Sequence, residues 1–311
     1  MFANFPTTFL SPYDDGGATV PILPGTPELV VDHPSTCGEG PLWHEEEQAL
    51  YWVDIPNGQL FRFDPAAGEN REVYKHESEV GGYTFQADGS ILLFCSFGQV
   101  VRWHQGTVET IIESIPDEAD SRFNDVTAAP DGSVFCGTMP SKKHLARLYR
   151  LAPDGSLTML FDDIGLSNGF GFSPDLGTFY HTDSNFHVIY QMDYDTSTGE
   201  VANRRILTRT PKDESVPDGM TVDAEGNIWS ARWNGEALYK YSPDGELVGK
   251  VPFPVRKVSS VAFGGANSEI AYVTTAGGND RGEVEGILAG SLFRVDLGVG
   301  GRAPFKSRIG L

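Results

Sequence analysis

The sequence predicts an all-β fold, a six-bladed β-propeller with a short N-terminal extension. Strand-like patterns recur six times at spacings of 41 to 50 residues, and no segment of 11 or more residues has a convincing helical period. A unit of this size with two hairpins matches a four-stranded propeller blade. A pair of β-sandwiches is the alternative, but the repeats favour the propeller. We place the extension at residues 1–26 and the propeller at residues 27–311.

Each repeat contains two strand patterns, which run in step along the chain. The first is a turn followed by a short apolar strand, and three of its turns carry Asp-Gly or Asp-Leu-Gly. Its copies are Glu46–Val53, Asp88–Phe94, Asp131–Cys136, Asp175–His181, Glu225–Ser230 and Ala266–Val273. The second alternates apolar and polar residues, as a half-buried strand does. Its copies are Leu60–Pro65, Val101–Gly106, Leu148–Leu151, Ile189–Asp193, Leu238–Tyr241 and Leu292–Asp296.

The composition excludes several classes of protein. The 311 residues carry 23 Lys and Arg against 43 Asp and Glu, a formal charge of -20, which repels phosphate backbones and attracts cations. We therefore expect no nucleic-acid partner. Apolar runs of at most five residues predict no membrane segment. The absence of a signal-peptide pattern and three scattered cysteines predict a cytoplasmic protein, and no pattern specifies an oligomeric state.

One position in each repeat predicts a metal site. Stepping back seven residues from each turn of the first pattern gives Glu39, Gly81, Asn124, Asn168, Asp218 and Ser259. Equivalent positions on inner strands ring a propeller's channel, so these residues are expected to converge. Four of the six offer a carboxylate or amide oxygen, and two carboxylates at one point are costly to bury without a cation.

The set of donors favours a hard ion. Because it contains no Cys or His, we expect one divalent ion, with Ca²⁺ as the first choice and Mg²⁺, Mn²⁺ or Zn²⁺ as alternatives. The competing interpretation is that these side chains only cap turns. Because four oxygen-donating residues occupy the same position in their repeats, we favour the metal site over the turn caps.

The same positions lie within motifs that resemble a known family. Gly38–Trp43, Arg122–Asp125, Ser167–Gly169 and Pro217–Met220 are similar in order and spacing to the senescence-marker-protein/gluconolactonase/regucalcin-like family, over about residues 30–300. The resemblance implies a six-bladed propeller that binds one divalent metal in its channel and hydrolyses a sugar lactone.

The resemblance also implies roles for individual residues. It implies that Glu39, Asn168 and Asp218 are metal ligands and that Asp218 is also the acid/base. Arg122 and Asn124 are implied as substrate contacts. The family places a further substrate-binding Glu after the strand that matches Cys136–Met139. Here residues 140–144 read Pro-Ser-Lys-Lys-His without a Glu, so the sugar specificity is open.

The implied site could hydrolyse an ester. A bound cation polarises a carbonyl and acidifies water, and a carboxylate beside it can move the proton. Asp218 is our choice for this role, with Glu39 as the alternative. Arg122 lies two residues before Asn124, and residues two apart in a strand share a face, so both could reach the channel mouth. The alternative for Arg122 is a surface ion pair.

The sequence is also compatible with two other functions. The alternatives are a metal-dependent organophosphate or other ester hydrolase and a non-catalytic calcium-binding propeller.

Gly165–Gly169 also matches the G-x-S-x-G pattern of a nucleophile elbow, with Ser167 as the nucleophile. That motif requires a following helix, whereas a strand and a turn are expected here.

Overall fold

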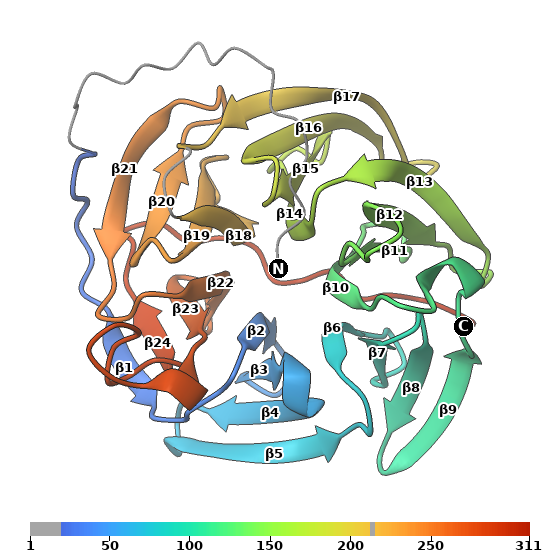
Figure 1. The fold of residues 1–311 in the computed structure, drawn as a ribbon, viewed down its shortest axis with the longest axis horizontal. Helices are drawn as coiled ribbons and strands as arrows, with labels where there is room; N and C mark the ends of the chain where they lie inside the picture. Colours follow the sequence, from blue (N-terminus) through green and yellow to red (C-terminus); the bar gives the residue numbers. More distant parts are fainter. Residues whose placement is uncertain (1–19, 212–214) are drawn as a thin grey trace.

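The computed structural model describes residues 20–211 and 215–311. Within these residues, 24 strands form six antiparallel four-stranded sheets around a central channel (Figure 1). The expected six-bladed propeller is therefore confirmed. Blade 1 contains β2 (Gly38–His44), β3 (Ala49–Asp54), β4 (Gln59–Asp64) and β5 (Glu69–Lys75). Blade 2 contains β6 (Val80–Phe85), β7 (Ile91–Cys95), β8 (Val100–His104) and β9 (Thr107–Ile112).

The remaining blades follow in chain order, each with its first strand beside the channel. Blade 3 contains β10 (Phe123–Ala128), β11 (Val134–Thr138), β12 (Ala146–Leu151) and β13 (Leu157–Ile164). Blade 4 contains β14 (Ser167–Phe172), β15 (Thr178–Asp183), β16 (Val188–Asp195) and β17 (Glu200–Arg209). Blade 5 contains β18 (Val216–Val222), β19 (Ile228–Trp233), β20 (Ala237–Tyr241) and β21 (Leu247–Pro252). The short 3₁₀ helices are Ile55–Asn57, Pro116–Glu118 and Gly278–Asp280.

Blade 6 is assembled from both ends of the described chain. It contains β22 (Val258–Gly264), β23 (Ile270–Thr275), β24 (Leu292–Val295) and, as its outer strand, β1 (Glu28–Val31), which pairs with β24. The Glu28–Arg294 ion pair lies across this junction. The pairing closes the ring, because the N-terminal strand completes a sheet that the C-terminal part begins.

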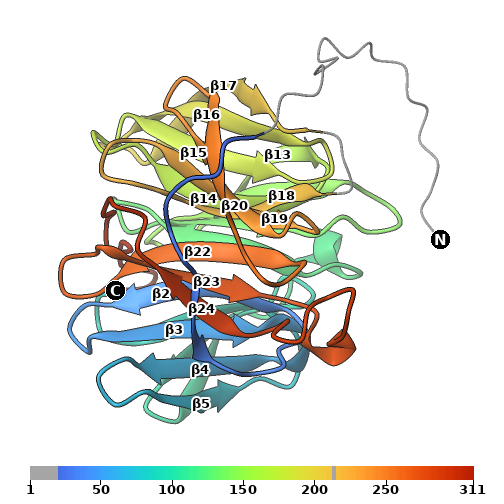
Figure 2. The same ribbon diagram turned by 90° about the vertical axis from the view of Figure 1, so that its left-hand side faces the viewer.

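The two sequence patterns correspond to the second and third strands of each blade. For example, Asp131–Cys136 leads into β11, and Leu148–Leu151 lies in β12. The position seven residues before each turn therefore falls on the first strand, next to the channel. Figure 2 shows the strands of blade 1 in order from the axis outward.

The hydrophobic core lies between the blades. Six buried apolar clusters each join two neighbouring blades. Between blades 5 and 6, for instance, Trp229 of β19 belongs to one cluster with Val261 and Phe263 of β22. Full burial of one such side chain contributes about 1.5–3 kcal/mol, so the contacts between blades hold the inner strands at fixed positions.

The N-terminal end of the described chain lies against the outer strands, and the C-terminal end crosses the channel. Of the expected extension at residues 1–26, residues 1–19 lie outside the described residues, and Leu23 bonds to Lys250 of β21. Residues 300–311, which we call the C-terminal strap, cross the end of the channel where the inner strands finish (Figure 1). Hydrogen bonds or ion pairs join the strap to all six blades, through Glu46, Phe85, Gly132, Pro174, Ala224 and Ser268. None of the helices in the described part could span a membrane.

Candidate active site

Four of the six equivalent positions place a carboxylate or amide oxygen at the start of an inner strand. We call Glu39 of β2, Asn124 of β10, Asn168 of β14 and Asp218 of β18 the oxygen ring. Each is only 3–6% exposed. The C-terminal strap lies at the other end of the same strands.

All six inner strands are irregular at this level. Each has a register shift against its neighbour, as between Phe123 and Val126 of β10 and between Pro217 and Met220 of β18. A β-bulge bends the strand and changes where its side chains point. The repeated bulge therefore allows side chains from different blades to meet at the axis.

Two glycines permit the inner strands to approach closely. Gly169 has a φ of +22°, and a Cβ on it would lie 2.6 Å from the carbonyl oxygen of Asp218. A Cβ on Gly219 would lie 2.1 Å from the Ser260 Oγ. These contacts supply a structural reason for the glycine that follows Asn168 and Asp218 in the sequence.

The two asparagines of the oxygen ring lie side by side. Asn124 Nδ2 donates to the Asn168 Oδ1 and, at 2.9 Å, to the Ser167 carbonyl oxygen. Asn168 Nδ2 donates to Ser184 Oγ at 2.8 Å, and Ser184 donates to the Pro217 carbonyl at 2.6 Å. Because the Asn168 amide nitrogen is held by Ser184, its oxygen is turned toward Asn124.

The two carboxylates of the ring are buried with few partners. Glu39 Oε2 accepts the Gly40 N–H at 2.9 Å, and no described side chain donates a hydrogen bond to Glu39 or Asp218. Burial, then the charges of Asp125 and Asp218, raise the pKa of Glu39 well above its usual value. Burial, then Asp125, likewise raise the pKa of Asp218. Both groups resist ionisation unless positive charge is added.

Asp125 is a third carboxylate at this site that the sequence analysis missed. Its Oδ2 accepts the Gly169 N–H at 2.7 Å, and burial raises its pKa to about 6 despite that bond and the positive charge of Arg122. In a regular strand Asp125 would point away from the side that Asn124 faces. The bulge in β10 removes this alternation, so that Asn124 and Asp125 both contact β14.

Arg122 lies beside the oxygen ring, just before β10 begins. Its Nη1 donates to Asn124 Oδ1 at 2.7 Å and to the Phe123 carbonyl at 2.8 Å. Its Nε is 3.8 Å from Glu79 Oε2. The structure thus brings Arg122 and Asn124 together, although Arg122 is not part of the strand itself.

This arrangement fits a divalent cation. The negative charge of Asp125 raises the pKa values of both Glu39 and Asp218. The one guanidinium that acts on all three carboxylates is that of Arg122, which lowers their pKa values. In the described residues no three His, Cys, Asp or Glu side chains form a metal-binding group. A site here therefore needs the amide oxygen of Asn168 in addition to Glu39 and Asp218. Two carboxylates and an amide oxygen are ligands that Ca²⁺ accepts.

The two positions without an oxygen donor of this kind have structural roles. Ser259 Oγ donates to the Gly38 carbonyl at 2.6 Å and so joins blade 6 to blade 1. A Cβ on Gly81 would lie 1.9 Å from the Phe123 carbonyl oxygen, which leaves no room for a side chain there.

The loop that lacks the family's Glu has one acidic partner, Asp120. Lys143 pairs with Asp120 at 3.0 Å, and His144 lies 3.8 Å from the same carboxylate. These contacts hold the loop between β11 and β12 to the segment that precedes β10.

The nucleophile-elbow interpretation of Ser167 is not supported. The residue begins the strand β14, and no helix follows it. Its Oγ lies 2.9 Å from the Nε2 of His181, but both side chains are completely buried, and burial lowers the pKa of His181 to about 3. This pair is part of the core, and substrate has no access to it.

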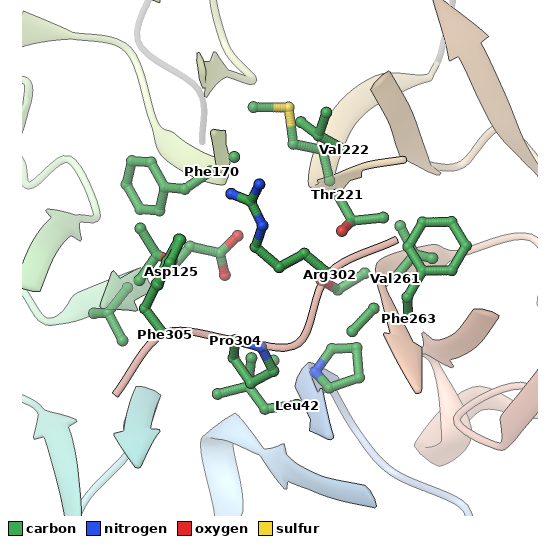
Figure 3. Close-up of a pocket in the computed structure, with 18 of the residues that line it drawn as sticks. Leu42, Asp125, Phe170, Thr221, Val222, Val261, Phe263, Arg302, Pro304 and Phe305 are labelled. Carbon is green, nitrogen blue, oxygen red and sulfur yellow. The ribbon is translucent and has the colours of Figure 1, made fainter. Parts of the chain in front are cut away.

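Beyond the oxygen ring the channel becomes a chamber of about 140 Å³ that is lined by both polar and apolar groups. The strap contributes Arg302, Pro304 and Phe305 to its wall, and Figure 3 shows the Arg302 side chain extending across it. Asp125 also lines this chamber, and Figure 3 shows its carboxylate pointing into it.

With this geometry established, the chain can be compared with known proteins. The family described as "SMP-30/Gluconolactonase/LRE-like region" matches residues 37–277. The chain belongs to this family. Membership confirms the resemblance drawn from the motifs, and the matched region contains every residue of the oxygen ring.

Individual members of the SMP-30/gluconolactonase family match nearly the full chain. Pentonolactonase XacC of Haloferax volcanii is 43% identical over 288 residues, covering 91% of this chain and 98% of its own. Human regucalcin is 33% identical over 297 residues, covering 90% and 97%. The solved structure of a luciferin-regenerating enzyme superposes with a TM-score of 0.83 at 29% identity, covering 92% of this chain and 100% of its own.

Proposed function

We propose that this protein is a divalent-metal-dependent lactonase that opens a small sugar lactone. The observation that supports it most is the oxygen ring, in which buried carboxylates with raised pKa values gather beside an amide oxygen and Arg122. A relative named pentonolactonase, 43% identical over nearly the whole chain, favours a five-carbon sugar lactone as substrate.

Glu39, Asn168 and Asp218 would hold the cation, and Ca²⁺ is our first choice. The name of the regucalcin relatives is consistent with that choice. When bound, the cation supplies Lewis-acid polarisation of the lactone carbonyl and lowers the pKa of water.

Side chains of the site move the proton and orient the substrate. Asp218 takes a proton from the attacking water, the ester C–O bond breaks, and Asp218 returns the proton to the ring oxygen that leaves. The product is a hydroxy acid. Asp218 is our choice for this role, as the family resemblance implies, with Glu39 as the alternative; each carboxylate accepts a backbone N–H from the glycine that follows it. Arg122 and Asn124 orient the substrate beside Asp218.

A substrate panel tests this proposal. We expect acid release from D-xylono-1,4-lactone and D-glucono-1,5-lactone, loss of turnover after chelation, and recovery when a divalent ion is returned. Diisopropyl fluorophosphate serves as the organophosphate arm of the panel. Turnover of that compound alone would replace our proposal with an organophosphate hydrolase. Cation binding with no turnover of either class would indicate a non-catalytic calcium-binding protein.

A further inference from the structure

We propose that Glu79 is a substrate-binding residue that, together with Arg122, recognises hydroxyl groups on the lactone ring. This inference deepens the lactonase proposal and depends on it. Glu79 directly precedes β6 in blade 2, whereas Arg122 precedes β10 in blade 3. The two side chains meet at the start of the inner strands, next to the oxygen ring.

Arg122 has unused hydrogen-bonding capacity on the side that faces Glu79. Both hydrogen bonds that its guanidinium makes within the described residues come from Nη1, to Phe123 and Asn124. The Nε lies 3.8 Å from the Glu79 carboxylate, which is an ion-pair distance and too long for a hydrogen bond. The guanidinium therefore retains donors at Nε and Nη2.

Glu79 has unused acceptors in the same place. Its side chain is 45% exposed, and its one described hydrogen bond is a long one, 3.4 Å from Ser96 Oγ. A row of polar contacts runs from Glu79 through Arg122 and Asn124 to Asn168. A substrate beside Asn168 would thus extend along this row toward Glu79.

The pairing of a free acceptor with a free donor selects hydroxyl groups. A hydroxyl can donate to the carboxylate and accept from the guanidinium at once, and neighbouring hydroxyls can use both groups. A site built to bond a hydroxyl discriminates strongly against an analogue that lacks it. The substrate class that this geometry selects is therefore a polyhydroxylated lactone rather than a plain cyclic ester.

The test compares two lactones that share one ring. D-xylono-1,4-lactone carries hydroxyl groups, whereas γ-butyrolactone has the same ring without them. For Glu79→Gln we expect kcat/KM on the sugar lactone to fall about 10-fold to 100-fold, with less than a 2-fold change on γ-butyrolactone. Glu77→Gln, an exposed acid two residues away, is the matched control and should change neither value.

A purely structural role of Glu79 would give a different result. If Glu79 only positioned Arg122, Glu79→Gln would reduce turnover of both lactones by the same factor, and that outcome would overturn the proposal. Binding of D-xylonate, measured by calorimetry, gives a second readout that does not need turnover. Weaker binding to Glu79→Gln than to the unchanged protein would support the proposal even if no lactone were hydrolysed. Equal binding, or no binding to either, would contradict it.

Discussion

The two ends of the channel are built from the same six strands, yet they differ in chemistry. At the oxygen ring, two carboxylates are buried with few partners beside two hydrogen-bonded amides, and burial raises the pKa of each acid. At the strap end, rings such as Phe172 and Phe305 pack edge to face with centroids 5.7 Å apart. The buried acids at the oxygen ring therefore lower the stability of the fold, whereas the aromatic packing at the strap end raises it. Substitutions at the ring should alter activity, and substitutions at the strap should alter stability.

The largest expected effect is at Asp218. Asp218→Asn should reduce kcat at least about 1,000-fold, because the variant loses both a cation ligand and the group that moves the proton. Its melting temperature without added metal should be unchanged or higher, because a buried acid is removed. Steady-state kinetics and calorimetric melting measure the two quantities. Asp244→Asn, in an exposed turn, is the control. Near-normal turnover of Asp218→Asn would show that another residue moves the proton.

A smaller effect is expected at Asp125, which lies between the ring and the chamber. Asp125→Asn keeps an acceptor for the Gly169 N–H but removes a negative charge close to Glu39 and Asp218, which would help to attract a cation to them. We expect divalent-cation affinity to fall about 10-fold, in the range typical of groups that support metal ligands. Calorimetric titration measures this affinity. Asp125→Ala should lose more, since the bond to Gly169 is also lost, and an unchanged affinity in both variants would refute this role.

The pH dependence of stability should reveal the same carboxylate. Because folding raises the pKa of Asp125 from 3.8 to about 6, its contribution to the metal-free protein is most favourable below about pH 4. As the pH rises from about 4 to about 6, folding should lose about 3 kcal/mol through this residue. Chemical denaturation across this range measures the loss, and Asp125→Asn should lack it. An equal slope in both proteins would contradict the expected linkage.

The smallest effect on activity is expected at the strap. Phe305→Ala removes a half-buried ring that contacts Phe172, so we expect a loss of about 1–2 kcal/mol in unfolding free energy. The kcat should change less than 2-fold, because the strap lies at the far end of the inner strands from Asp218. Denaturation and kinetics on the same preparation test both statements. A large drop in kcat with unchanged stability would show that the chamber takes part in catalysis.

The sequence alone predicts the blades and the oxygen ring, for a physical reason. A repeated unit places equivalent residues at equivalent distances from the axis, so the spacing of Glu39, Asn124, Asn168 and Asp218 already indicates that they share one level of the channel. The order of strands within each blade follows from the same repeat.

Other parts of the site could not be predicted from the local sequence. The alternation of a regular strand would place Asp125 on the face opposite Asn124. A bulge in β10 changes the direction of its side chain, and this bulge leaves no clear pattern in the sequence. Glu79 lies outside the repeated strands, and its contact with Arg122 depends on how blades 2 and 3 pack together. The strap and the pairing of β1 with β24 join distant segments, and no pattern within either segment encodes them.

The most direct test of the central claim is the number of divalent cations bound per chain. Titration of metal-free protein with Ca²⁺ should give one site per chain, and Glu39→Gln, Asn168→Ala and Asp218→Asn should each abolish it or weaken it severely while the fold is retained. Absence of binding by the unchanged protein to Ca²⁺, Mg²⁺, Mn²⁺ and Zn²⁺, or binding that survives all three substitutions, would contradict the account.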